Sequence, residues 1–297
     1  MVTPMDKDGK IKTELAGPLI ELYKKQQANG LYMLGWTGEG AHLSKEKRMQ
    51  WAEAVLEAAK DKMPVLVHVG YNSNLDDSVE LAKHAAEHGA SGVSSVGISS
   101  NVTLRDNVEY FKRISAAAPD IPFYIYWVDG GRTLTGGKEI QPAEILKEMN
   151  AVPTFAGIKF TDTNFYYLER FKKHDHNLNI LTGVEEVALC ALLMGADGNI
   201  GAIQAVTCYH YQEMRRCVEQ GDYKGAKELQ YRANEVAEAY KNVEIGNLPG
   251  IKLLFKRIYG IDVGYCAPNG PFAGHEISEE NGDYLEKVFR KNIILPD

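Results

Sequence analysis

The stretch Thr154-Phe155-Ala156-Gly157-Ile158-Lys159-Phe160 indicates the fold most directly. Apart from its lysine, it is small or apolar, and a short apolar run of this kind is typical of a buried strand. Similar apolar runs recur on both sides of this stretch, through the first two-thirds of the chain. They cover residues 31–34, 65–69, 92–96, 123–126, 155–160, 180–182 and 199–203.

Longer stretches between these runs carry apolar residues three and four positions apart, a spacing that predicts amphipathic helices. They cover residues 13–29, 45–59, 75–88, 108–118, 142–149, 166–173 and 185–194. Ser44 and Asn107 precede two of them and are suited to cap their first turns. Strands that alternate with helices pair in parallel, because parallel neighbours need a crossover connection.

The alternation suits either a closed barrel or a doubly wound open sheet. No early GxGxxG precedes a helix, which weakens the dinucleotide-binding form of the open sheet. Repeats of about 25–35 residues, close to the length of one strand–helix unit, favour the barrel. We therefore expect an α/β fold, a (β/α)8 TIM barrel over residues 1–207 followed by a helical C-terminal extension over residues 208–297.

The beginning of the chain differs from this pattern. Only Val2-Thr3-Pro4 precedes the turn-like Asp6-Lys7-Asp8-Gly9, so a first strand of normal length does not fit. We expect that the first strand is truncated and that the native chain starts upstream of Met1.

Bulk composition limits the class of protein. Hydrophobic residues make up 44% and charged residues 25% of the 297 residues, as in ordinary globular proteins. The formal net charge of -7 gives no support for a nucleic-acid partner. There is no run of about 18 apolar residues, so we expect no membrane span. The scattered cysteines lack a CxxC pair and suit reduced thiols in a cytoplasmic enzyme without a metal; they are Cys190, Cys208, Cys217 and Cys266.

Lys159 is the charged residue of the opening stretch. Lysines rarely lie in such runs, because removing an ammonium group from water is costly. Lys159 either ends a strand and extends to solvent or, in a barrel, lies at the C-terminal end of a strand and faces the active-site mouth. There, burial favours the uncharged amine, which can attack a carbonyl carbon.

Two other strand ends carry candidate site residues. Gly35-Trp36-Thr37-Gly38-Glu39-Gly40 follows the run 31–34, and its backbone N–H groups with the Thr37 hydroxyl suit a carboxylate, although it is also an ordinary loop composition. Tyr124 and Tyr126 share one face of another strand, where a phenol can relay a proton or simply pack. The glycine-rich segment 130–137 resembles a mobile substrate loop, with Arg132 as a carboxylate ligand, or an exposed turn.

Taken together, these segments resemble the dihydrodipicolinate synthase and N-acetylneuraminate lyase family of class I aldolases. The most specific segments are Gly35-Trp36-Thr37-Gly38-Glu39, the tyrosine strand, Gly157-Ile158-Lys159-Phe160 and Gly195-Ala196-Asp197-Gly198-Asn199-Ile200-Gly201. Their order and separations extend over nearly the whole chain. Within the family, Lys159-Phe160-Thr161-Asp162-Thr163 and Gly183-Val184-Glu185-Glu186 are most similar to the N-acetylneuraminate (sialate) lyase branch.

The resemblance implies a role for each matching residue. Lys159 is implied as the Schiff-base lysine and Tyr126 as the proton relay. Thr37 and the backbone beside Trp36 are implied to bind the carboxylate of the keto acid. The residues implied to bind the polyhydroxy tail of the sugar are Thr161, Gly183, Glu185 and Glu186. The family also implies a homotetramer and no cofactor.

The resemblance implies cleavage of N-acetylneuraminate to N-acetylmannosamine and pyruvate. Three departures keep an alternative open, an aldolase or dehydratase for another 2-keto acid such as a deoxy-keto-gluconate. Glu185 stands where aspartate is usual, Ala202 stands where a hydroxyl residue is typical, and the loop 130–137 is longer than in relatives. A third possibility is a non-catalytic protein that senses keto acids. The presence of Lys159, Tyr126 and Thr37 together disfavours it, because a sensor does not need the residues of the reaction.

Overall fold

The computed structural model describes residues 1–71 and 74–296, and the chain divides into two compact units. The central unit comprises Pro64–Gly201, and the terminal unit combines Met1–Met63 with Ala202–Asp297. The domain boundary expected between residues 207 and 208 is a different division, and it stays a prediction.

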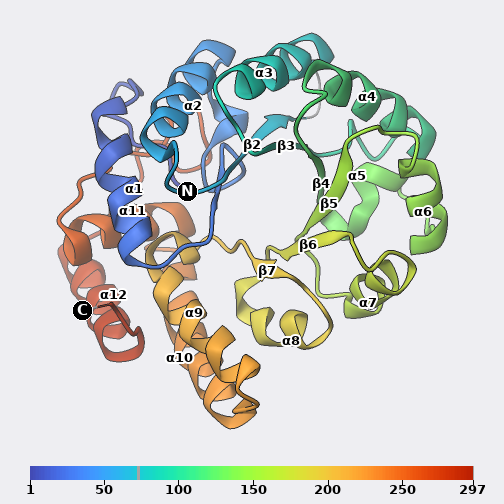
Figure 1. Cartoon of the computed structure of the whole chain (residues 1–297). Helices are drawn as coiled ribbons and strands as arrows, with labels where there is room; N and C mark the ends of the chain where they lie inside the picture. The colour runs from blue at the N-terminus through green and yellow to red at the C-terminus, as the bar shows by residue number, and fades with distance from the viewer. Residues whose placement is uncertain (72–73, 297) are drawn as a thin grey trace. The chain divides into compact units, whose positions relative to one another are not determined.

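The central unit contains parallel strands that hydrogen-bond in chain order (Figure 1). They are β2 (Val65–Gly70), β3 (Gly92–Ser95), β4 (Phe123–Trp127), β5 (Phe155–Phe160), β6 (Asn179–Thr182) and β7 (Gly198–Asn199). The helices between them are α3 (Leu75–Glu87), α4 (Leu104–Ala117), η3 (Asp129–Gly131), α5 (Arg132–Thr135), α6 (Pro142–Met149), α7 (Phe165–His174), η4 (Glu185–Val187) and α8 (Ala188–Leu193). As predicted, parallel strands alternate with helices.

Successive side chains of a strand point to opposite faces, and this alternation separates core packing from candidate chemistry. Trp127 of β4 stacks on Phe160 of β5 with ring centroids 5.8 Å apart, and it contacts Phe171 of α7 at 5.5 Å. The face of β4 and β5 that carries Trp127 and Phe160 is therefore covered by α7. Tyr126 and Lys159 precede them by one position and lie on the opposite face, paired in register.

The terminal unit joins the two ends of the chain. Its first part contains η1 (Thr13–Leu15), α1 (Ala16–Lys25), β1 (Leu31–Met33), η2 (Gly40–His42) and α2 (Lys45–Ala59), and its second part contains α9 (Gln204–Glu219), α10 (Tyr223–Lys241), α11 (Asn247–Tyr259) and α12 (Glu279–Asn292). Among the described residues before η1 there is no strand, but Met5 forms bridges to Ile11 and Gly264. The helical character predicted from residue 208 onward is confirmed.

Several predicted boundaries differ from those of the structure; the helix expected over residues 13–29, for example, ends at Lys25. Two of the differences change the partners of a residue or the length of a strand. Asn107 does not cap a helix, because α4 already begins at Leu104. Thr103 caps it instead, in a capping box with Asp106, whose backbone N–H donates to Thr103 Oγ1 at 3.3 Å. Asn107 is fully buried, and its amide accepts from Ile98 N at 2.7 Å and donates to Leu134 O at 2.8 Å. The cap predicted at Ser44 is confirmed by its bond from Lys47 N.

The second difference is at the end of β7. The strand expected over residues 199–203 is limited to Gly198–Asn199, although Ile200 N still donates to Thr182 O at 2.6 Å. Ile203 has helical torsion angles and leads directly into α9, so the remaining apolar residues cannot extend the strand. In the segment 130–137, expected to be a mobile substrate loop or an exposed turn, η3 and α5 extend as far as Thr135 and Arg132 is exposed. Carboxylate binding by Arg132 stays a prediction.

Candidate active site

Lys159 and Tyr126 are brought together in the central unit, on adjacent strands β5 and β4. The Lys159 side chain is buried, with 7% of its surface exposed, and its Nζ lies 4.1 Å from the centre of the Tyr126 ring. A lysine ammonium group this close to the face of a phenol ring is attracted by the ring quadrupole. The pair offers a primary amine for a carbonyl carbon and an aromatic hydroxyl on the neighbouring strand.

Tyr124 shares the face of Tyr126 but lies two residues earlier in β4, out of register with Lys159. It pairs in register with Gly157, where a side chain would collide with its ring, since a Cβ would come within 2.3 Å of Tyr124 Cε1. Its hydroxyl donates to Asn179 Oδ1 at 3.2 Å. Burial, and to a smaller extent the charge of Asp197, raises the pKa of Tyr124. Of the two tyrosines, Tyr126 is the one beside the lysine.

Thr161 and Gly183 follow β5 and β6 and lie against each other. A Cβ on Gly183 would come within 2.0 Å of Thr161 Oγ1, so only glycine leaves room for this hydroxyl. Gly183 N donates to Phe160 O at 2.8 Å, which continues the pairing of the two strands. Over residues 1–71 and 74–296, the buried Thr161 Oγ1 makes no hydrogen bond. A buried hydroxyl in this state can bond to a polar ligand.

Glu185 and Glu186 begin η4, which follows β6 after the two residues Gly183 and Val184. Glu185 is 5% exposed, and its side chain lies against the backbone of Gly201, where an added Cβ would be 2.6 Å from Glu185 Oε2. Glu186 is half-buried. The two carboxylates follow the strand next to β5, where hydroxyl groups of a ligand can donate to them.

The turn that carries Trp36 and Thr37 belongs to the terminal unit. The Trp36 side chain is exposed and Thr37 is half-buried. Thr3 Oγ1 donates to Gly38 O at 2.6 Å and ties the turn to the start of the chain. Because Lys159 lies in the other unit, binding of one ligand by both Thr37 and Lys159 stays a prediction.

A buried ion pair holds a residue of the same turn, Glu39. Glu39 Oε1 lies 2.8 Å from Lys252 Nζ of α11, and each side chain is 3% exposed. Glu39 Oε2 accepts from Ala267 N at 2.6 Å, and Lys252 Nζ also donates to Thr3 O at 2.9 Å. Glu39 has a positive φ of 56°, an uncommon backbone state for a residue other than glycine. The side-chain partners of Glu39 therefore help to hold the turn in this conformation.

His68 and Ser94 are side chains at this site that sequence reasoning missed. His68 of β2 is fully buried, and its Nδ1 is hydrogen-bonded to Ser94 Oγ of β3 at 2.9 Å. The His68 ring meets the Tyr126 ring edge-on, with centroids 5.5 Å apart and planes at 88°. The available signal was a histidine inside the apolar run 65–69.

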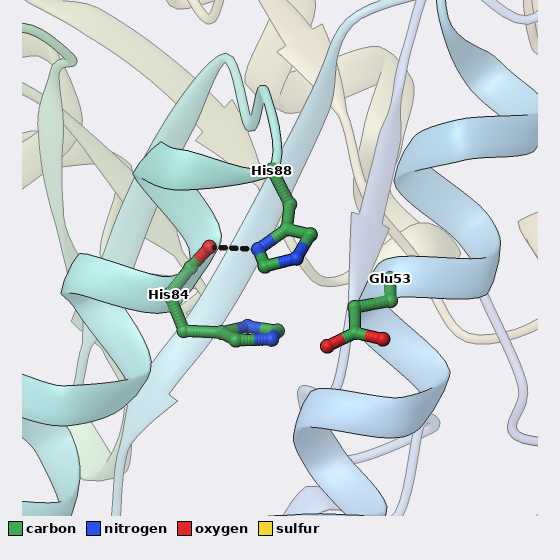
Figure 2. A group of neighbouring side chains, drawn as sticks. All are labelled: Glu53, His84 and His88. Carbon is green, nitrogen blue, oxygen red and sulfur yellow. Dashed lines mark hydrogen bonds between the residues drawn. The ribbon is translucent and has the colours of Figure 1, made fainter.

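A separate histidine pair lies on the helix after β2. Figure 2 shows His84 and His88, one turn apart at the end of α3, with ring centroids 4.2 Å apart. His88 Nδ1 donates to the carbonyl oxygen of His84 at 2.8 Å. Glu53, also drawn, belongs to the terminal unit. Two imidazoles supply only half of the ligands of a structural zinc site, and neither lies on the strands of Lys159 and Tyr126.

Comparison with known proteins decides the family. A model of the "Dihydrodipicolinate synthetase family" matches residues 1–288. The chain belongs to this family. N-acetylneuraminate lyase from Mus musculus is 34% identical over 78% of this chain and 73% of its own length. The protein of the same name from Gallus gallus is 32% identical over 100% of this chain and 95% of its own length.

Solved structures agree with this assignment to the dihydrodipicolinate synthetase family. Proteus mirabilis N-acetylneuraminate lyase superposes with a TM-score of 0.87 at 26% identity, covering 99% of this chain and 97% of that one. The sialic acid aldolase of Ruminococcus gnavus gives the same TM-score at 25% identity, covering 98% and 97%. The predicted fold class, an α/β barrel fold with C-terminal helices, is confirmed, as is the membership of a family of carbon–carbon lyases. No helix among the described residues is long and apolar enough to cross a membrane.

Proposed function

We propose that this protein is a class I aldolase that cleaves N-acetylneuraminate to N-acetylmannosamine and pyruvate, with Lys159 as the Schiff-base residue. One observation carries the proposal: the buried Lys159 amino group, with Nζ 4.1 Å from the centre of the Tyr126 ring. The relatives that are N-acetylneuraminate lyases suggest the substrate. No metal or organic cofactor is required, because an iminium formed on the lysine accepts the electrons of the broken bond.

The reaction begins when the uncharged Lys159 amine attacks C2 of the open-chain keto acid and water leaves, which gives the iminium. Tyr126 then accepts the proton of the C4 hydroxyl while the C3–C4 bond breaks, and the bonding electrons move into the iminium to give an enamine. The first product, N-acetylmannosamine, departs as the aldehyde. Protonation of the enamine at C3 and hydrolysis release pyruvate and regenerate the amine.

The remaining residues of the proposed site bind the two ends of the substrate. Thr37 and the backbone beside Trp36 bind the carboxylate. The polyhydroxy tail is bound by Thr161, Gly183, Glu185 and Glu186. The unbonded Oγ1 of Thr161 and the carboxylate of Glu185 against Gly201 support this half of the proposal. Holding both ends places C2 against the amine and so lowers the entropic cost of attack.

Borohydride trapping with pyruvate tests the mechanism. We expect reduction to leave a stable adduct whose mass increase maps to Lys159, and we expect Lys159→Ala to lose both adduct and turnover while the protein remains folded. Tyr126→Phe should form the adduct but cleave sialate about 100-fold or more slowly, because it loses the proton relay. Lys138→Ala, at an exposed lysine, is the matched control and should behave as wild type. An adduct on another lysine contradicts the assignment.

A comparison of two substrates on the wild-type protein tests the alternative function. Ala202 supplies no hydroxyl, the feature that favours a keto acid with a different tail. We expect kcat/KM for N-acetylneuraminate to exceed that for 2-keto-3-deoxy-gluconate. The reverse order would assign the protein to the alternative while leaving Lys159 as its nucleophile.

We further propose a homotetramer that works in the cytoplasm. The proposal of a tetramer comes from the family resemblance, and that of the compartment from the scattered cysteines, which are free thiols in the structure. Light scattering of the purified protein tests the assembly, and a monomeric mass would contradict it.

A further inference from the structure

His68 is a buried titratable side chain that the proposed mechanism does not use. It lies in β2 with no exposed surface, and Ser94 Oγ of β3 holds its Nδ1 at 2.9 Å. The hydrogen bond fixes the rotation of the imidazole about its Cβ–Cγ bond. His68 therefore presents its ring to its neighbours in a single orientation.

Adjacent strands β2, β3, β4 and β5 each contribute one side chain to one group. His68 pairs in register with Ser94, and Tyr126 pairs with Lys159. The Tyr126 ring contacts both His68 and Lys159: the His68 ring is edge-on to it at 88°, and Lys159 Nζ lies 4.1 Å from its centre. The phenol ring of Tyr126 thus contacts a hydrogen-bonded imidazole and the amine of Lys159.

We infer that His68 is a positioning residue for Tyr126, which fixes the plane of the phenol ring and thereby the direction of its hydroxyl. This inference rests on the proposed aldolase function. An edge-to-face aromatic contact restricts the tilt of a ring, and proton transfer requires the hydroxyl to point at its partner. His68 itself receives no proton from the substrate in this proposal.

A purely structural role for His68 makes different predictions. If the imidazole only fills the core, its loss lowers stability and affects every step at Lys159 alike. If it positions Tyr126, its loss slows cleavage and leaves Schiff-base formation with pyruvate intact, because that capture uses the amine and not the phenol as proton relay. The ratio of kcat to the extent of pyruvate trapping separates the two roles.

Two substitutions dissect the contact. His68→Asn keeps a polar group toward Ser94 but removes the ring, and we expect kcat for sialate to fall on the order of 10- to 100-fold. His68→Phe keeps a ring edge against Tyr126 and should recover most of this loss. Trapping of pyruvate on Lys159 should change by less than about 2-fold in both variants, which is the deviation expected when two sites act independently. An equal loss of kcat in the two variants would show that the His68 ring does not position Tyr126, and it would overturn the inference.

A double-mutant cycle with Tyr126→Phe provides the decisive measurement. Because His68 acts through the Tyr126 hydroxyl, adding His68→Asn to Tyr126→Phe should lower kcat by no more than about 2-fold further. A full additional loss overturns the inference. If His68→Asn does not fold, Ser94→Ala replaces it in the cycle, since it frees the imidazole in place and should lower kcat in the same direction.

The proposed function and this inference fail in distinguishable ways. Wild-type protein that does not trap pyruvate on Lys159 contradicts the aldolase proposal itself. Wild-type protein that traps pyruvate and cleaves sialate, together with a folded His68→Asn variant of unchanged kcat, contradicts only the role of His68.

Discussion

Gly201 leaves space in the candidate site that the Glu185 side chain occupies. Its backbone lies so close to Glu185 that an added Cβ would be 2.6 Å from both Cβ and Oε2 of that residue. Contacts below about 3 Å force one partner to move, and a close-packed surrounding leaves little room for it. The position of the Glu185 carboxylate is therefore set by the absence of a side chain at Gly201.

Gly201→Ala should displace Glu185 and weaken binding of the sugar tail. We expect KM for N-acetylneuraminate to rise about 10-fold or more, the equivalent of about 1.4 kcal/mol, with unchanged trapping of pyruvate on Lys159. Gly17→Ala in α1 is the matched control, because a Cβ there meets no atom within 4 Å. It should leave KM unchanged and stabilise the helix slightly. An unchanged KM in Gly201→Ala would argue against Glu185 as a sugar ligand.

At the scale of elements, His210 connects two helices to the C-terminal segment. It lies in α9, and its Nε2 donates to Leu229 O of α10 at 2.9 Å while its Nδ1 accepts from Ile294 N at 3.1 Å. Both ring nitrogens are satisfied only in the neutral imidazole. Burial lowers the pKa of His210, the Arg232 charge lowers it further, and the Leu229 bond and Glu213 oppose this shift.

The lowered pKa predicts a loss of stability in mild acid. Below about pH 6.5, the ordinary pKa of histidine, the unfolded chain takes up a proton that the folded protein does not, so the free energy of unfolding falls as the pH falls. Urea unfolding at pH 8, 7, 6 and 5 measures the effect. His210→Gln, which keeps a donor and an acceptor but does not titrate, should show a shallower decline than wild type. Parallel pH profiles would contradict this role.

At the scale of the whole molecule, distant parts of the chain meet in the terminal unit. Lys252 of α11 contacts Glu39 after β1 and Thr3 near the first residue, and Glu39 in turn accepts from Ala267. A buried charge that loses its partner is costly, whereas a pair replaced together leaves no charge uncompensated. The ion pair therefore couples the stability of the N-terminal segment to that of the C-terminal helices in the terminal unit.

Lys252→Met should lower the free energy of unfolding by about 3–5 kcal/mol, because it leaves the Glu39 carboxylate buried without its cation. Adding Glu39→Gln to Lys252→Met should restore part of this loss, and urea unfolding of both variants provides the measurement. Lys256→Met is the matched control in the same helix: Lys256 Nζ lies 3.4 Å from Asp262 Oδ2, but both side chains are exposed. Equal losses at Lys252 and Lys256 would contradict the special cost of the buried pair.

Features that depend on local pattern could be predicted from the residues alone. The apolar run around Lys159 and the alternation at Tyr126 set the two strands and the faces of their side chains, and parallel pairing brings the two residues together. The cap at Ser44 was equally local. The partners of His68, Asn107 and Lys252 could not be predicted in this way and are known only from the folded protein. Those contacts join different elements, from 9 residues apart for Ile98 and Asn107 to 249 for Thr3 and Lys252. Periodicity indicates which face of an element is buried but not which side chain will contact it.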